Sequence, residues 1–102
     1  MISTIRKRGK SMKIQKAASA GTMESSDIMI TILPSQEEKI EIDLNSNVQK
    51  QFGRQICSVI KEELKQAGIT AATVRAVDKG ALDCTIRARM DAAIARACGE
   101  EN

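Results

Sequence analysis

The sequence contains no histidine, tryptophan or tyrosine, and Phe52 is its one aromatic residue. Without histidine, a histidine-containing zinc site is impossible, and the side chain that most often activates a hydroxyl for catalysis is missing. With a single ring, recognition of bases or sugars by aromatic stacking is almost excluded. The mean hydropathy is −0.24, and no apolar run is long enough to span a membrane. The core of the fold must therefore be aliphatic.

The three cysteines form no recognisable metal or redox motif. Cys57, Cys84 and Cys98 are odd in number, and no pair has the C-x-x-C spacing. We interpret them as reduced thiols, with Cys98 as a small core residue because it follows Met90 and Ile94 at helical spacing. No glycine-rich phosphate loop occurs, and the acidic residues occupy positions typical of solvated faces. We predict no catalytic residue and no metal site.

The positive charge of the chain is confined to its beginning. The 102 residues carry a net charge of +3, from 16 basic and 13 acidic side chains. Four of the basic residues, Arg6, Lys7, Arg8 and Lys10, lie in the first eleven positions, which contain no acid. This segment is a disordered leader, a stretch upstream of a true start at Met12, or a basic tail that binds nucleic acid. The remainder is nearly neutral and has the length of one domain.

Hydrophobic alternation predicts two strands in the first half of the chain. "IMITIL" at 28–33 is apolar on both sides, so we expect a strand that is covered on both faces. "KIEIDLN" at 39–45 alternates strictly, and the polar "SQEE" between the two runs predicts a hairpin. Residues 1–26 show little periodicity and are interpreted as tail and loop.

A helix, a strand and a second helix are predicted in the other half. Ser46 and Gln49 have capping-box spacing, and Gly68 has the place of a C-cap. The apolar stripe of the first helix comprises Val48, Phe52, Ile56, Ile60 and Leu64. "ITAATVRAVDKG" predicts the third strand, which ends in a turn. The apolar side of the second helix comprises Leu82, Ile86, Met90, Ala93, Ile94 and Ala97.

The order β-β-α-β-α predicts an α+β fold, a two-layer sandwich in which two helices cover one face of a small three-stranded sheet. We expect a flexible basic tail and loop at 1–26, the folded domain at 27–98 and a C-terminal tail at 99–102. Arg87, Arg89 and Arg96 are interpreted either as the solvated side of the second helix or as a contact for an acidic partner or a phosphate.

Two adjacent serines, Ser25 and Ser26, stand in "AGTMESSD", just before the first predicted strand. Small residues precede them and acidic residues flank them, so the segment is expected to be exposed and within reach of a modifying enzyme. The plainer interpretation is that these polar residues merely begin a strand. From the residues alone, a small interaction domain is as far as function can be predicted.

From Met12 on, the chain resembles the acyl carrier protein, or gamma subunit, family of bacterial citrate lyase. The similarity covers nearly all of residues 12–98 and rests on three stretches, "MKIQKAASAGTMESSD", "LNSNVQKQFG" and "DKGALDCTIRARMDAAIARA". The last stretch is long and unusual, which makes the resemblance specific. The first eleven residues lie outside it.

The resemblance implies a covalent cofactor on Ser25, a phosphoribosyl-dephospho-coenzyme A group joined through a phosphodiester. The next position, commonly glycine in the family, is Ser26 here. In that family the arm carries acetyl and citryl thioesters: the alpha subunit exchanges acetyl for citryl, and the beta subunit cleaves the citryl thioester to oxaloacetate. A separate transferase attaches the cofactor. The resemblance thus implies a non-catalytic, cytoplasmic carrier with these three partners and with neither a membrane nor nucleic acid among them.

Two other functions remain open at this point. One is a carrier subunit of a related complex such as malonate decarboxylase, which shares the chemistry of the arm. The other is an unmodified binding module that uses the basic tail of residues 1–11.

Overall fold

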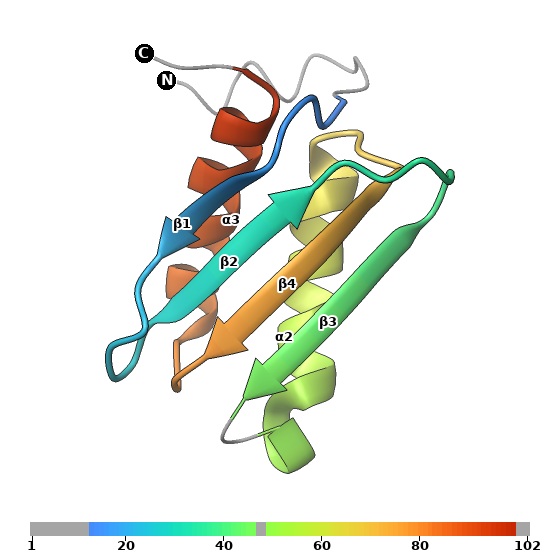
Figure 1. Ribbon diagram of the computed structural model, residues 1–102. Coiled ribbons are helices and arrows are strands. Elements are labelled where there is room, and N and C mark those ends of the chain that lie inside the picture. The colour runs from blue at the N-terminus through green and yellow to red at the C-terminus, as the bar shows by residue number, and fades with distance from the viewer. Residues whose placement is uncertain (1–12, 47–48, 100–102) are drawn as a thin grey trace.

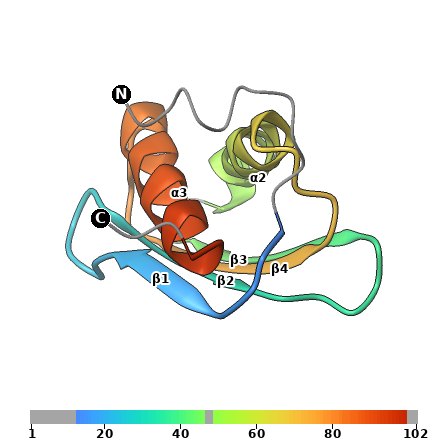
Figure 2. The same cartoon turned by 90° about the horizontal axis from the view of Figure 1, so that it is seen from above.

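The computed structural model describes residues 13–46 and 49–99, which form one sheet and two helices (Figure 1). The elements in chain order are β1 (Ala18–Gly21), β2 (Ile28–Leu33), β3 (Ile40–Ser46), α2 (Gln49–Gln66), β4 (Ala72–Asp78) and α3 (Asp83–Ala97). The strand order across the sheet is β1-β2-β4-β3. Both helices lie on one face of this sheet, and no described helix or strand covers the other face, which we call the bare face, as the view from above shows (Figure 2). The predicted two-layer α+β architecture is confirmed.

The predicted number of strands is wrong, because the sheet has four strands and not three. The additional strand, β1, lies within the segment that was interpreted as tail and loop, and it pairs antiparallel with β2. Its sequence "ASAG" has no strand propensity, but Ala20 is buried and α3 packs against this strand. Tertiary packing thus overrides local preference. Residues 1–12 lie outside the described part of the chain, and the domain boundary before residue 27 stays a prediction.

The predicted hairpin is also wrong, because β2 and β3 are not neighbours. β4 lies between them, antiparallel to β2 and parallel to β3. The segment β3–α2–β4 is therefore a βαβ unit, in which a helix connects two parallel strands that no tight turn can join. Strict alternation located β3, and the short apolar run located β2, but neither pattern carried information on which strands pair.

The core lies between the sheet and the two helices. Ile28, Ile30 and Ile32 of β2 have no exposed surface, whereas Met29, Thr31 and Leu33 point to the bare face and are half-buried. The prediction that this strand is covered on both faces is therefore wrong. The described parts of the helices contribute nine hydrophobic residues that are fully or nearly fully buried, Ile56, Val59, Ile60, Leu64, Ile86, Met90, Ala93, Ile94 and Ala97. Each large side chain among them stabilises the fold by about 1.5–3 kcal/mol.

Among the described residues, the predicted C-cap of the first helix is confirmed, and so are the two apolar stripes except at Phe52 and Leu82. The predicted capping box depends on the Gln49 side chain and stays a prediction. Gly68 adopts a φ of 75°, and the amides of Gly68 and Ile69 donate to the carbonyls of Lys65 and Leu64, the pattern of a Schellman C-cap. Phe52 and Leu82, predicted to be buried, are 51% and 70% exposed. Val48 and the side chain of Gln49 lie outside what the structure describes. Cys98 is half-buried and packs against the core, as predicted.

Candidate functional site: the serine loop

The loop that carries both serines, residues 22–27, connects β1 to β2 at one end of the sheet. Gly21 enters the loop with a φ of 105°, and a Cβ atom there would lie 1.8 Å from the carbonyl oxygen of Ile28. Only glycine allows this close approach of backbone to backbone. The amide of Asp27 donates to the carbonyl of Glu24 at 3.2 Å, which closes a β-turn with Ser25 and Ser26 at its tip.

Both tip residues are exposed, but their backbones differ. Ser26 has a φ of 65°, in the left-handed region that glycine adopts without strain. A glycine at this position would adopt the same backbone conformation without strain. Ser25 has no positive φ, and among the described residues its hydroxyl has no hydrogen-bond partner. The Ser25 hydroxyl is thus presented to solvent.

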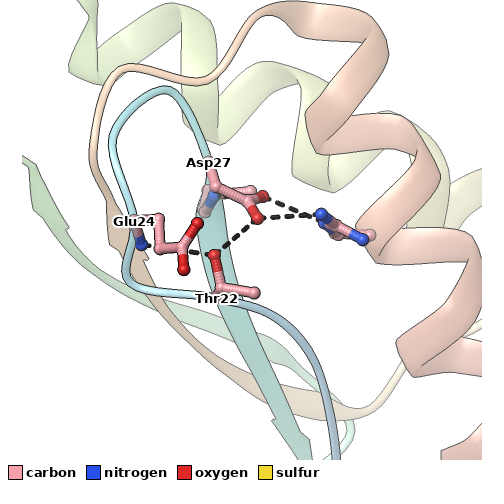
Figure 3. A network of polar contacts seen from close by, with 5 residues as sticks. Thr22, Glu24 and Asp27 are labelled. Carbon is pink, nitrogen blue, oxygen red and sulfur yellow. Dashed lines mark hydrogen bonds and ion pairs between the residues drawn. The ribbon is translucent and has the colours of Figure 1, made fainter.

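Asp27 organises the loop from within (Figure 3). Its carboxylate accepts a hydrogen bond of 2.7 Å from the Thr22 hydroxyl and one of 2.7 Å from the amide of Ile28. The Thr22 oxygen in turn accepts from the amide of Glu24 at 3.2 Å. The two sides of the loop are therefore connected through one carboxylate.

The same carboxylate joins the loop to α3. Arg89 donates from Nε and Nη2 to the two oxygens of Asp27, at 2.9 and 2.8 Å, which is the bidentate geometry that gives the strongest ion pairs. The Asp27 side chain is 12% exposed. The Arg89 guanidinium, with smaller contributions from Thr22 and the Ile28 amide, holds the pKa of Asp27 far below its usual range. Asp27 raises the pKa of Arg89 in return, so both groups are charged at all ordinary pH values.

A second connection joins the loop to the turn after β4. The amide of Ser26 donates to the carbonyl of Lys79 at 2.8 Å, and the amide of Lys79 donates to the carbonyl of Asp27 at 2.8 Å. The turn itself is held by buried Asp78, which accepts from the Ser46 hydroxyl and from the amides of Gly80 and Ala81. The serine turn is therefore fixed on both sides while its tip stays exposed.

The three arginines of α3 all have partners within the chain. Arg87 forms ion pairs with Glu62 and Glu63 of α2, and Arg96 donates to the carbonyl of Ser19. Arg96 is exposed, and Arg87 and Arg89 are 39% and 38% exposed, so the solvated-face interpretation holds in part. A contact of these arginines with a partner or a phosphate stays a prediction. The Asp27–Arg89 pair was missed because its members are 62 residues apart, and no local pattern indicates such a pairing.

Among the described residues, no side chain forms a hydrogen bond that would activate the Ser25 hydroxyl. Within residues 13–46 and 49–99, no cluster of three potential ligands could hold a metal ion. Over the same residues, no helix is long and apolar enough to cross a membrane. Within the described residues, the site is an exposed hydroxyl on a turn that is held from both sides.

The comparisons with known proteins identify the family. A family model described as "Malonate decarboxylase delta subunit (MdcD)", of the type ACP, matches residues 15–97. The chain is 54% identical over 91 residues to the citrate lyase acyl carrier protein of Streptococcus equi subsp. zooepidemicus (strain MGCS10565), covering 89% of each chain. It is 57% identical to that of Latilactobacillus sakei subsp. sakei (strain 23K), again over 89% of each chain. The chain belongs to the family of citrate lyase acyl carrier proteins.

Solved structures show the same fold at much lower sequence identity. A chain in the crystal structure of a Pseudomonas malonate decarboxylase hetero-tetramer in complex with malonate superposes with a TM-score of 0.73 at 17% identity, covering 85% of this chain and 89% of that one. The homoserine kinase of Cytophaga hutchinsonii gives a TM-score of 0.57 at 13% identity, covering 91% of this chain but 38% of the kinase. The architecture therefore recurs in proteins of unrelated function.

Proposed function

We propose that this chain is the acyl carrier subunit of a citrate lyase and that its covalent arm is attached to Ser25. The family and the close relatives support the carrier role. The observation that carries the assignment of Ser25 is its place at the tip of a turn that is fixed from both sides, with its hydroxyl exposed. Ser26 is equally exposed, but its backbone amide is engaged with Lys79 and its φ is strained.

The residues of the loop fit a phosphoribosyl-dephospho-coenzyme A group. A bulky anionic cofactor needs an acceptor hydroxyl that projects from the surface, and Ser25 provides one. The group supplies a thiol that carries acetyl and citryl units as thioesters. The chain contributes the Ser25 oxygen of the phosphodiester, and Asp27 and Arg89 hold that oxygen in a fixed place relative to the body.

A carrier of this kind gains its effect from tethering. A thioester attached to a small domain stays near the active sites that use it, so each transfer becomes effectively intramolecular. The partners are then the citrate lyase alpha and beta subunits and the transferase that attaches the cofactor. In this proposal the chain supplies no catalytic group, and its cytoplasmic location stays a prediction.

The mass of the intact protein tests the proposal. After co-expression with the cofactor transferase, the parent should gain the mass of one phosphoribosyl-dephospho-coenzyme A group. Ser25→Ala should gain nothing, and the matched control Ser26→Ala should gain the same mass as the parent. Loading of Ser25→Ala to the level of the parent would show that the attachment site is wrong.

A second candidate, a carrier of malonate decarboxylase, is favoured by the description of the family model and by the superposed decarboxylase subunit. Both functions use the same arm, so loading does not separate them. Co-purification does: the loaded chain should be recovered with citrate lyase subunits and should support citrate cleavage. Recovery with malonate decarboxylase subunits alone would favour the second candidate.

The third possibility, nucleic-acid binding by the basic tail, concerns residues 1–11, which lie outside the described residues. It predicts binding that weakens steeply with salt and disappears when those residues are deleted. Absence of salt-dependent binding would eliminate it.

A further inference from the structure

A hollow of about 430 Å³ opens beside the serine loop, between the first turns of α2 and the turn that leads into α3. Its walls are mainly apolar and include Phe52, Ile56, Ala81 and Leu82. Its volume lies in the range of small-molecule sites. Phe52 and Leu82 are two of the three exposed large hydrophobic residues in the described chain, and the third, Met23, lies in the serine loop itself. Exposed apolar surface that gathers at one place indicates a binding site.

The hollow adjoins the serine turn through shared backbone. Gly80 and Asp78 line it, and Lys79 between them exchanges hydrogen bonds with Ser26 and Asp27. From these contacts and standard backbone spacings, Ser25 lies within roughly 10 Å of the wall at Gly80. An arm attached to Ser25 is therefore always beside this opening.

The polar side chains around the hollow are already paired with one another. Gln55 donates to Asp83 at 2.8 Å, which joins α2 to α3 across the rim, and Asp78 is occupied by Ser46, Gly80 and Ala81. A ligand therefore need not supply hydrogen bonds to these side chains, and the carboxylates of Asp78 and Asp83 repel phosphates. It is suited to a neutral, largely apolar chain, and it disfavours the anionic part of a nucleotide.

We propose that this hollow receives the neutral outer part of the arm on Ser25, the pantetheine chain with its free thiol or acetyl thioester, while the phosphates stay in solvent. This inference rests on the proposed function, because it requires an arm on Ser25. The tether gives the arm a local concentration in the millimolar range, so a weak site suffices to hold it. Weak binding also lets the arm leave for a partner subunit. The hollow is a resting site that withdraws the acetyl thioester from water between transfers.

The single phenylalanine of the chain makes a direct test possible. Replacement of phenylalanine by 4-fluorophenylalanine labels Phe52 alone, on the wall of the hollow. The fluorine NMR resonance of the loaded protein should be displaced from that of the bare protein by more than its linewidth. The loaded protein should also unfold at a higher temperature than the bare one, because the arm binds only the folded hollow.

Matched variants isolate the hollow from the attachment itself. In Leu82→Ser, full loading by mass should be accompanied by little displacement of the resonance and by no gain in unfolding temperature. Leu82 is largely exposed, so this variant should fold. The control Leu33→Ser, on the bare face of the sheet, should keep both effects. Ser25→Ala, treated in the same way, should show neither.

The outcomes separate the inference from the function on which it rests. If the mass does not rise in the parent, the proposed function and the inference are both overturned. If the mass rises but the resonance of Phe52 does not move, the inference alone is overturned. If the resonance moves only when citrate lyase subunits are added, the hollow is a docking site for a partner, and the inference is again overturned.

Discussion

The two polar loops that flank β2 differ in what holds them. Residues 34–39, after β2, are held mainly by local contacts: Ser35 with Glu37, and Lys39 with Glu37 and Glu41. Two further contacts join this loop to residues 70–72. The Thr70 hydroxyl donates to Glu38, and the amide of Ala72 donates to the carbonyl of Lys39. The serine loop, before β2, is instead joined to α3 through a bidentate ion pair whose carboxylate is 12% exposed, and to the turn after β4 through two backbone hydrogen bonds.

The difference shows that the fold fixes the position of the serine loop more firmly than the position of the loop after β2. Exposed ion pairs such as those of Lys39 contribute little to stability, because water and salt screen them. A buried carboxylate with a bidentate partner fixes the relative position of the two elements that carry them. Removing the partner leaves an unpaired buried charge. The loop that holds Ser25 is thus anchored to two distant elements, while the loop at the other end of β2 is held weakly. Four predictions test this contrast.

The largest effect is expected at the entrance to the serine loop. In Gly21→Ala the new methyl group meets the backbone of Ile28, so the free energy of unfolding should fall by about 3 kcal/mol or more. The control Gly80→Ala shares a positive φ, of 96°, but its Cβ would enter open space. It should lose only the strain of that conformation, about 1–2 kcal/mol. Urea unfolding followed by circular dichroism measures both, and equal losses would contradict the steric argument.

The second effect concerns the rate of cofactor attachment. Arg89→Met removes the partner of Asp27 and frees the turn, so attachment by the purified transferase should slow by roughly 10- to 100-fold. Arg89→Lys, which keeps the charge but not the bidentate geometry, should restore part of the rate. Lys39→Met, which removes the ion pairs of the other loop, should load at the rate of the parent. The time course of the mass increase gives the rates.

Stability controls complete that experiment. The rates are compared at a temperature at which circular dichroism shows every variant to be folded, so that unfolding does not contribute. If Arg89→Met and Lys39→Met then load equally fast, the anchoring of the serine loop has no role in attachment.

The third effect is a dependence on acid. The pKa of Asp27 is lowered in the folded protein, and an unfolded aspartate has a pKa of about 3.9. The stabilisation from ionised Asp27 is therefore complete above about pH 5 and is lost progressively as the pH falls below about 4. The difference in unfolding free energy between the parent and Asp27→Asn should be constant near neutral pH and shrink in acid. A difference that stays constant down to pH 2 would show that the carboxylate charge does not anchor the loop.

The sequence predicted well the elements that have a periodic hydrophobic pattern, and poorly the contacts between residues that lie far apart in the chain. Alternation located β3, the short apolar run located β2, and the spacing of Ile56, Ile60 and Leu64 located the buried side of α2. These patterns did not reveal β1, whose small residues are held by pairing and by α3, or the insertion of β4 between β2 and β3. The candidate serine came from the resemblance. Its anchor, Arg89, comes from a helix 62 residues away, so only the folded chain brings the two together.

The smallest expected effect is an exchange at the tip of the serine turn. Ser26 has a φ of 65°, which costs a residue with a side chain about 1 kcal/mol that glycine does not pay. Ser26→Gly should therefore raise the free energy of unfolding by about 0.5–1 kcal/mol and leave attachment at Ser25 unchanged. Ser35→Gly in the other loop has no such strain to relieve. It should lower stability by at least a similar amount, through the added freedom of the unfolded chain and the loss of the Ser35 hydrogen bonds with Glu37. If Ser26→Gly raises the free energy of unfolding and Ser35→Gly lowers it, the backbone conformation of the serine turn is one that Ser26 disfavours. Destabilisation by both would show that the left-handed residue is not strained.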